Sequence, residues 1–379
     1  MKTGIATVPL DYGKCPLWLF ERMKKLARAV SIAIVEEFGP EEFLRRLSDP
    51  TWFQSLGCVM GFDWNSSGLT TTTLGALKEG IKGLESDLGI FICGGKGKTS
   101  KKTPNQIQDW GQFLGLSMEK IDNLVYASKI SAKVDSSLIQ DGFQLYHHNL
   151  IFTKGGDYTV VQQGMNTDFK KARRYHWSSS KVKNFVEEPH SGIASQIKVS
   201  PLNLTAKKSK DNREISAQIV KQEPNKFLKD IKLISEKSDN LIKQKRFSGF
   251  NEMELNNVEF HWHPVVSEKF DLKRLEKTIF SAKEQNPQNF EHFLSLKGIG
   301  PKTIRALSLV SELIYGAKPS YEDPARYSFS VGGKDGTPFP VNRNIYDKVL
   351  DIMEKGIKKS NISINEKQNA LKRLQKTSI

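Results

Sequence analysis

The chain has 379 residues, of which 57 are Lys or Arg and 42 are Asp or Glu, so its formal net charge is +15. This excess favours a polyanionic partner, nucleic acid ahead of a membrane surface, and a chain of this length has room for two or three domains. No run of 18 apolar residues and no signal peptide is found, and Cys15, Cys58 and Cys93 form no Cys-x-x-Cys pair, so we expect a cytoplasmic protein without transmembrane helices, disulfides or a cysteine zinc site.

The first hundred residues are mainly helical in pattern. Apolar residues recur at helical spacing over 15–38, and Gly39-Pro40 ends this predicted helix. Further helices are predicted over 41–47 and 70–84, with an apolar cluster between them. Residues 90–93 are typical of a short buried strand.

A flexible, lysine-rich loop is predicted directly after this strand, over 94–102. Its Lys96 and Lys98 are candidates for contact with phosphate. The run Gly97-Lys98-Thr99 is similar to the end of a nucleotide-binding P-loop, but Ile92 stands where that motif needs its first glycine. A solvated basic loop is therefore the favoured interpretation.

Two helices and a β-hairpin follow the loop. Thr103-Pro104 begins the first helix, and the second covers about 118–134. Aromatic and β-branched residues over 143–152 and 158–163 predict two strands joined at Gly155-Gly156. Helices and antiparallel strands in this order predict an α+β fold.

The register of this hairpin follows from the length of its loop. If Gly155-Gly156 is the whole loop, His148 pairs with Gln163 and Asn149 pairs with Gln162. Alternation along the first strand then separates its side chains into two sets. One face carries His148, Leu150 and Phe152, and the other carries His147, Asn149 and Ile151.

The end of the hairpin is rich in directional hydrogen-bonding groups. His147, His148 and Gln163 are candidate catalytic residues, together with Asp141 just before the first strand. Carboxylates and imidazoles also hold divalent metal ions that activate water, which makes metal-dependent strand cleavage a second possible chemistry. The candidate metal ligands are Asp141, His148, Glu187 and His190. The alternative is that these groups satisfy one another inside the protein.

A basic and aromatic segment comes next. Arg173 and Arg174 are followed by Tyr175 and Trp177. Basic residues beside aromatic ones suit phosphate contact combined with base stacking, so all four are candidate nucleic-acid contacts. The alternative is a cationic surface with anchoring aromatic residues.

The strongest functional signal is a Gly-x-Gly turn between two helical patterns over 290–315. Gly298 and Gly300 permit a close approach of phosphate to the N-terminus of the second helix, and Pro301 suits the first turn of that helix. An ordinary turn between packed helices is the alternative. The predicted contacts with nucleic acid are Lys297, Gly298, Gly300, Lys302, Thr303 and Arg305.

The same segment resembles the helix-hairpin-helix motif, which implies sequence-independent contact with the DNA backbone. In the bifunctional DNA glycosylases of that superfamily, a lysine of the second helix attacks the sugar and an aspartate assists. The resemblance places Lys302 at the lysine position and makes it a candidate nucleophile for glycosylase or abasic-site lyase chemistry. Asn342 stands where the aspartate is expected, and it supplies neither a charge nor a base.

Short motifs along nearly the whole chain carry a second resemblance. They include Thr3-Gly4-Ile5-Ala6, Gly61-Phe62-Asp63-Trp64, Gln162-Gln163-Gly164-Met165-Asn166, Ala172-Arg173-Arg174-Tyr175-His176-Trp177 and Gly332-Gly333-Lys334-Asp335-Gly336. These motifs resemble the family catalogued as domain of unknown function 763, seen mainly in archaea. The resemblance implies no catalytic residue.

We divide the chain into a mixed α+β domain over 1–204, a basic and partly helical connecting region over 205–246, and a helical domain with the hairpin over 247–379. We expect a DNA-binding protein that acts as a repair or processing enzyme, with a divalent metal ion as a possible cofactor. The alternatives are a non-catalytic DNA- or RNA-binding protein and an enzyme acting on modified nucleotides.

Overall fold

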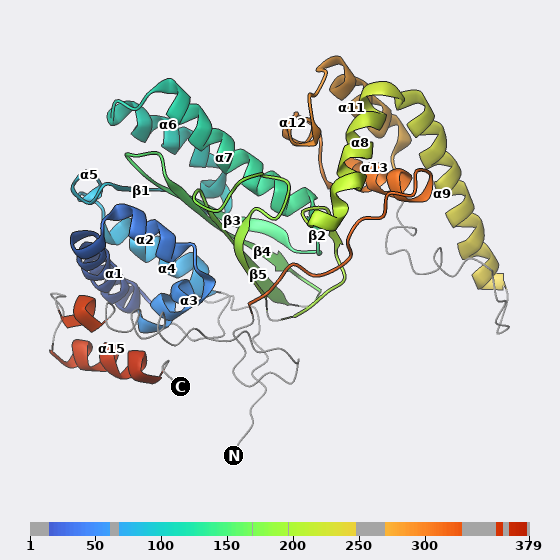
Figure 1. The fold of residues 1–379 in the computed structure, drawn as a ribbon. Coiled ribbons are helices and arrows are strands. Elements are labelled where there is room, and N and C mark those ends of the chain that lie inside the picture. The colour runs from blue at the N-terminus through green and yellow to red at the C-terminus, as the bar shows by residue number, and fades with distance from the viewer. Residues whose placement is uncertain are drawn as a thin grey trace.

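The computed structural model describes residues 15–60, 68–168, 170–195, 197–247, 270–327, 354–358 and 364–376. A five-stranded antiparallel sheet lies between two layers of helices, and a further group of helices lies beside it (Figure 1). The predicted α+β class is confirmed.

The sheet is antiparallel throughout, in the order β1-β3-β4-β5-β6. Its strands are β1 (Ile90–Lys96), β3 (Gln144–Thr153), β4 (Tyr158–Asn166), β5 (Lys171–Ser178) and β6 (His190–Ser195). Two short strands, β2 (Ile139–Gln140) and β7 (Leu202–Asn203), pair separately. Both faces of the large sheet are covered by helices, so side chains on both faces of its central strands are buried.

One face of the sheet packs on the N-terminal helices. These are α1 (Leu17–Phe38), α2 (Pro40–Leu47), α3 (Pro50–Val59) and α4 (Gly68–Gly80), and α5 (Glu85–Leu88) leads into β1. Ile92, Ile151 and Val161 of the sheet join the apolar side chains of these helices in one cluster. The helices predicted over 15–38 and 41–47 are therefore confirmed, as is the strand that begins at Ile90. The helix predicted over 70–84 is present as α4 but ends at Gly80.

The opposite face packs on two helices, α6 (Thr103–Phe113) and α7 (Met118–Ser137). Phe152, Val160 and Trp177 point to this side and are fully buried. Ser117 caps the N-terminus of α7 by accepting the Lys120 amide hydrogen bond, at 3.3 Å. Because α7 runs along the sheet, its residues face the strands over several turns.

A helical group continues from α7. It consists of α8 (Lys210–Gln222), α9 (Pro224–Phe247), α11 (Leu272–Glu284), α12 (Phe290–Ser295) and α13 (Pro301–Leu313), with η2 (Lys207–Ser209) before it. One apolar cluster includes side chains of α7, α8, α9, α11, α12 and α13. This shared core contains side chains from both sides of the predicted domain boundaries at 204 and 246. The domain division itself stays a prediction. A last helix, α15 (Ile364–Lys376), lies near α3.

The register predicted for the β3–β4 hairpin is wrong by one residue. His148 pairs with Gln162, and His147 pairs with Gln163. The reason is the loop, because Thr153 donates its amide hydrogen to Asp157 O at 3.0 Å and leaves three residues in the turn, not two. Gly156 takes φ +101°, which explains a glycine there. The two predicted faces of β3 are confirmed.

The lysine-rich stretch after β1 is not the predicted flexible loop. The strand continues to Lys96, and η1 (Gly97–Lys102) follows as a 3₁₀ helix. Gly94 has φ +96°, and a Cβ there would lie 2.2 Å from His148 O, so glycine is required where β1 passes β3. No helix in the described part of the chain has the length and apolar character needed to cross a bilayer.

Candidate functional site

The predicted Gly-x-Gly turn joins α12 to α13. Gly298 has φ +90°, a left-handed conformation that favours glycine. Gly300 is the N-cap of α13 in an extended conformation, φ −147°, and it is followed by Pro301 at the first helical position. The turn therefore needs a glycine at 298 for its backbone, whereas the backbone at 300 suits any residue.

The open side of this turn presents unpaired amide groups. Ile304 N donates to Gly300 O at 3.0 Å, while the Lys302 and Thr303 amides have no hydrogen-bond partner among the described residues. Among the described residues, nothing lies within 4 Å of a Cβ added at Gly298 or Gly300. The surface at the two glycines, next to these amides, is therefore open to a ligand.

Two of the three predicted cations of the turn face solvent. Lys297 and Lys302 are exposed. Arg305 is half-buried, and its Nε donates to Gln140 Oε1. Lys297 and Lys302 are thus available to an anion at the turn, and Arg305 helps to fix the turn in place.

Further contacts anchor the turn to the end of α7 and to β2. Lys133 Nζ donates to Leu296 O, and Gln140 Nε2 donates to Pro301 O at 2.9 Å. Burial lowers the pKa of Lys133 to about 8. The turn is therefore held at a fixed place relative to α7.

The expectation that β5 contacts nucleic acid is wrong for this structure. Arg173, Tyr175 and Trp177 are fully buried on the α7 side, and Arg174 is buried on the other side. Successive side chains of a strand point to opposite faces of the sheet, which explains why Arg174 lies on the other side from its neighbours. Helices cover both faces, which explains why all four side chains are buried. None of the four side chains forms a surface for phosphate or for bases.

Each of the two arginines has a structural role. Arg173 lies between two carboxylates, with Nη1 2.9 Å from Asp141 Oδ2 and Nη2 2.8 Å from Asp323 Oδ2. Arg174 Nη2 donates to Gln54 Oε1 at 3.0 Å, and its guanidinium lies over the Phe53 ring. Burial raises the pKa of Asp141 to about 6, so this carboxylate is still charged at pH 7 opposite Arg173.

The predicted metal ligands are not brought together. Asp141 binds Arg173 and Tyr175, and Glu187 pairs with Arg213. His148 and His190 belong to a third, separate set of hydrogen bonds described below. The described residues contain no group of three or more His, Cys, Asp or Glu side chains that could hold a metal ion. The predicted metal site is therefore wrong for this part of the chain.

His147 and Gln163 face the N-terminal helices, on the opposite side of the sheet from His148. Gln163 Nε2 donates to Tyr146 Oη at 2.5 Å. His147 is 2% exposed, and neither of its ring nitrogens has a hydrogen-bond partner among the described residues. Burial lowers the pKa of His147 to about 3, so the ring is neutral at pH 7.

His148 belongs to a buried chain of hydrogen bonds between β3, β4 and α7. Its Nε2 lies 2.9 Å from Ser128 Oγ, and its Nδ1 lies 2.7 Å from Gln162 Oε1. Gln162 Nε2 then donates to Asp135 Oδ2 at 2.5 Å. Asp135 also accepts from Trp177 Nε1 at 3.0 Å and contacts His190 Nε2 at 2.5 Å.

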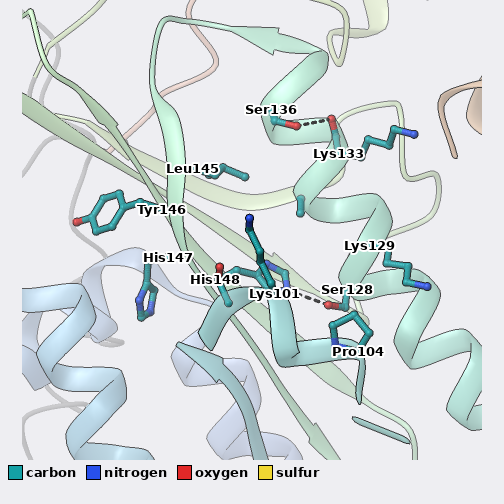
Figure 2. Close-up of a pocket in the computed structure, with 12 residues that line it drawn as sticks. Lys101, Pro104, Ser128, Lys129, Lys133, Ser136, Leu145, Tyr146, His147 and His148 are labelled. Carbon is teal, nitrogen blue, oxygen red and sulfur yellow. Dashed lines mark hydrogen bonds between the residues drawn. The ribbon is translucent and has the colours of Figure 1, made fainter. Parts of the chain in front are cut away.

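A pocket of about 390 Å³ opens at one end of this chain, between η1, α7 and β3. Figure 2 shows His148 directed toward Ser128 of α7, while His147 is directed away from it. Within the described part of the chain, the lining includes three lysines and no acidic residue. The lining residues are Ser100, Lys101, Pro104, Ser128, Lys129, Ala132, Lys133, Ser136, Leu145, Tyr146, His147 and His148.

Ser128 was not predicted as a site residue, whereas the polarity of Asp135 and Gln162 had drawn attention to both. A signal for Ser128 exists in the sequence, because Ser128, Ala132 and Ser136 recur every four residues and so form a small-residue wall on one side of a helix. The link to His148 required the position of α7 over the sheet, which the sequence does not give.

The remaining candidates lie apart from this chain of hydrogen bonds. Lys96 and Lys98 are exposed around the start of η1, and the Lys96 ammonium lies 5.9 Å from the centre of the Tyr146 ring. Lys302 is exposed on the first turn of α13. Asn342, the position of the expected glycosylase aspartate, lies outside the described residues.

Comparison with known proteins gives a family and no activity. A family model described as a protein of unknown function (DUF763) matches residues 4–341. No curated protein and no solved structure matches the chain.

Proposed function

The chain belongs to this family, and from its own residues we propose that it is a cytoplasmic DNA-binding protein that grips the phosphate backbone through the turn between α12 and α13 and processes the bound strand. The observation that carries the proposal is the pair of unpartnered amides of Lys302 and Thr303 behind two glycines with open space in front. Amides at a helix N-terminus bind phosphate by hydrogen bonding and by the helix dipole.

Gly300 supports this proposal independently. Neither its backbone angle nor its packing requires a glycine. The absence of a side chain there leaves the Lys302 amide accessible to a group as large as phosphate. Such contacts read the backbone and not the bases, so binding is expected to be independent of sequence.

The exposed ammonium groups suit the same role. Lys297 and Lys302 lie beside the amides and face solvent. A lysine that attacks a sugar is activated by burial or by a neighbouring charge, whereas exposure suits contact with phosphate. We therefore assign Lys302 to binding.

Binding is tested by fluorescence anisotropy with labelled double-stranded DNA of several sequences, from 50 to 200 mM salt. We expect Gly300→Val to weaken binding to every sequence by about tenfold or more, because its side chain blocks the amides. Lys297→Ala and Lys302→Ala should each reduce the slope of log affinity against log salt by about 1.

The matched control is Lys82→Ala, an exposed lysine between α4 and α5, on the other side of the sheet. This variant should keep the wild-type slope. Unchanged DNA affinity in folded Gly300→Val would refute the phosphate-binding turn. Binding of RNA in preference to DNA would favour the RNA-binding alternative.

A further inference from the structure

The buried chain of hydrogen bonds fixes the proton on His148. Trp177 Nε1 can only donate, so Asp135 Oδ2 accepts, and Gln162 must turn its NH₂ group toward the same oxygen. Gln162 Oε1 therefore faces His148 Nδ1 and accepts a hydrogen bond from its N–H group, so the ring proton stays on Nδ1. His148 Nε2 is left with a lone pair.

That lone pair faces a hydroxyl group. Ser128 Oγ lies 2.9 Å from His148 Nε2, so Ser128 donates its hydrogen to the ring. Burial lowers the pKa of His148, which keeps the imidazole neutral and able to accept a proton. A serine, a neutral histidine and a third group that orients the histidine are the parts of an activated nucleophile.

The pocket brings this pair to a space that a ligand can enter. Ser128 and His148 both line it, and its volume of about 390 Å³ lies in the range of small-ligand sites. Lys101, Lys129 and Lys133 give the wall positive charge. The chemistry of the wall therefore favours a phosphate ester.

The pocket also adjoins the turn that we propose to bind DNA. Lys133 lines the pocket and donates to Leu296 O at the start of that turn. A strand whose phosphate is held at the amides of α13 therefore lies close to the helix that carries Ser128.

We propose that Ser128 and His148 cleave a phosphodiester bond of the bound strand, with Ser128 as nucleophile and His148 as general base. This inference rests on the proposed function for the identity of its substrate. Gln162 and Asp135 are positioning residues that hold His148 in the required tautomer.

The reaction balances with water as the co-reactant. Ser128 Oγ attacks phosphorus, its proton passes to His148 Nε2, and the bond from phosphorus to the leaving oxygen breaks. That oxygen takes the proton from His148. Water then attacks the phosphoserine, passes a proton to His148 and releases the phosphate monoester, and the proton returns to Ser128 Oγ.

The nucleophile is tested without nucleic acid, by reaction of the full chain with an alkyl fluorophosphonate followed by peptide mass spectrometry. We expect one phosphonyl group on Ser128, none after Ser128→Ala, and unchanged labelling of Ser128 after Ser136→Ala. Ser136 is the matched control because it lines the same pocket and bonds Lys133 O, not a histidine. Absence of label on Ser128 in the folded wild type would overturn the proposal.

The base is tested by comparing Ser128→Cys with Ser136→Cys in reaction with iodoacetamide at pH 7. Ser128 is buried and Ser136 is exposed, so access alone favours the thiol at 136. If His148 removes the proton, the thiol at 128 reacts at least about tenfold faster. Because His148→Gln removes the base beside the same buried thiol, an unchanged rate at 128 in the Ser128→Cys/His148→Gln double variant would show a purely structural hydrogen bond and would overturn the proposal. Mapping separates these thiols from native Cys15.

The final arm uses labelled DNA and denaturing gels. The wild type should cut the strand through a covalent adduct, and Ser128→Ala should bind DNA normally and cut about 1000-fold more slowly. Gly300→Val should lose binding but keep the reaction with fluorophosphonate, so failure of the turn and failure of Ser128 are distinguishable. Labelled Ser128 without any strand cleavage by the wild type would refute the phosphodiester substrate.

Discussion

The buried ring of His147 predicts that the protein loses stability in mild acid. The perturbation is a change from pH 7 to pH 5, with and without His147→Leu. Burial lowers the pKa of this ring from 6.5 to about 3. Between pH 6.5 and about 3, the ring is therefore protonated in the unfolded chain and neutral in the folded protein. The unfolding free energy that His147 contributes above pH 6.5 is lost as the pH falls through this window.

The magnitude follows from the two pKa values. Each unit of pH in that window costs about 1.4 kcal/mol, so His147 removes about 2 kcal/mol of unfolding free energy between pH 7 and pH 5. Lowered pKa values at His148 and His176 add losses of the same sign, and the raised pKa of Asp141 opposes them. These contributions are common to the wild type and to His147→Leu, so the difference between the two proteins isolates His147.

The assay is urea denaturation at both pH values, followed by far-ultraviolet circular dichroism. His147→Leu should lose about 2 kcal/mol less than the wild type on acidification. It should be no less stable at pH 7, because the variant removes two buried ring nitrogens without partners among the described residues. The exposed His292 provides the control, since His292→Leu should lose as much as the wild type. Equal losses in the wild type and His147→Leu would refute the reasoning.

Two further predictions concern stability at neutral pH, each measured by urea denaturation. Arg173→Leu should lower the unfolding free energy by about 3–5 kcal/mol because it leaves two buried carboxylates without their cation. Lys208→Ala, at an exposed ion pair, should lower it by at most about 1 kcal/mol. Equal losses in the two variants would contradict the argument from burial. Gly298→Ala should cost about 1–2 kcal/mol through its left-handed backbone, and Gly300→Ala, which needs no such backbone, should stay within about 0.5 kcal/mol; the reverse order would show that the turn has another conformation.

The sequence predicted the elements better than their pairing. Hydrophobic periodicity identified α1, α7 and the two strands of the hairpin, because each buries a regular set of apolar side chains. The register failed at Gly155-Gly156, since one extra residue in the loop shifts every pair. Loop length depends on backbone angles that two adjacent glycines leave open.

The functional interpretation failed where burial could not be foreseen. Arg173, Tyr175 and Trp177 alternate with polar residues, which is typical of a strand with one solvent-exposed face. Here helices cover both faces, and the arginine is accommodated by carboxylates as distant in sequence as Asp323. His148 was selected for its polarity, but Ser128, the residue that it touches, comes from another element.

Arg173 also connects the sheet to a part of the chain that is synthesised much later. Asp323, one of its two carboxylate partners, follows it by 150 residues. The same segment adds a bridge between Ala194 and Tyr327 at the β6 edge of the sheet. Before Asp323 has been synthesised, Asp141 is therefore the one carboxylate of this pair that Arg173 has available. Because Asp323 follows the end of α13, Arg173 has both of its carboxylate partners only after the whole α12–α13 region has been made.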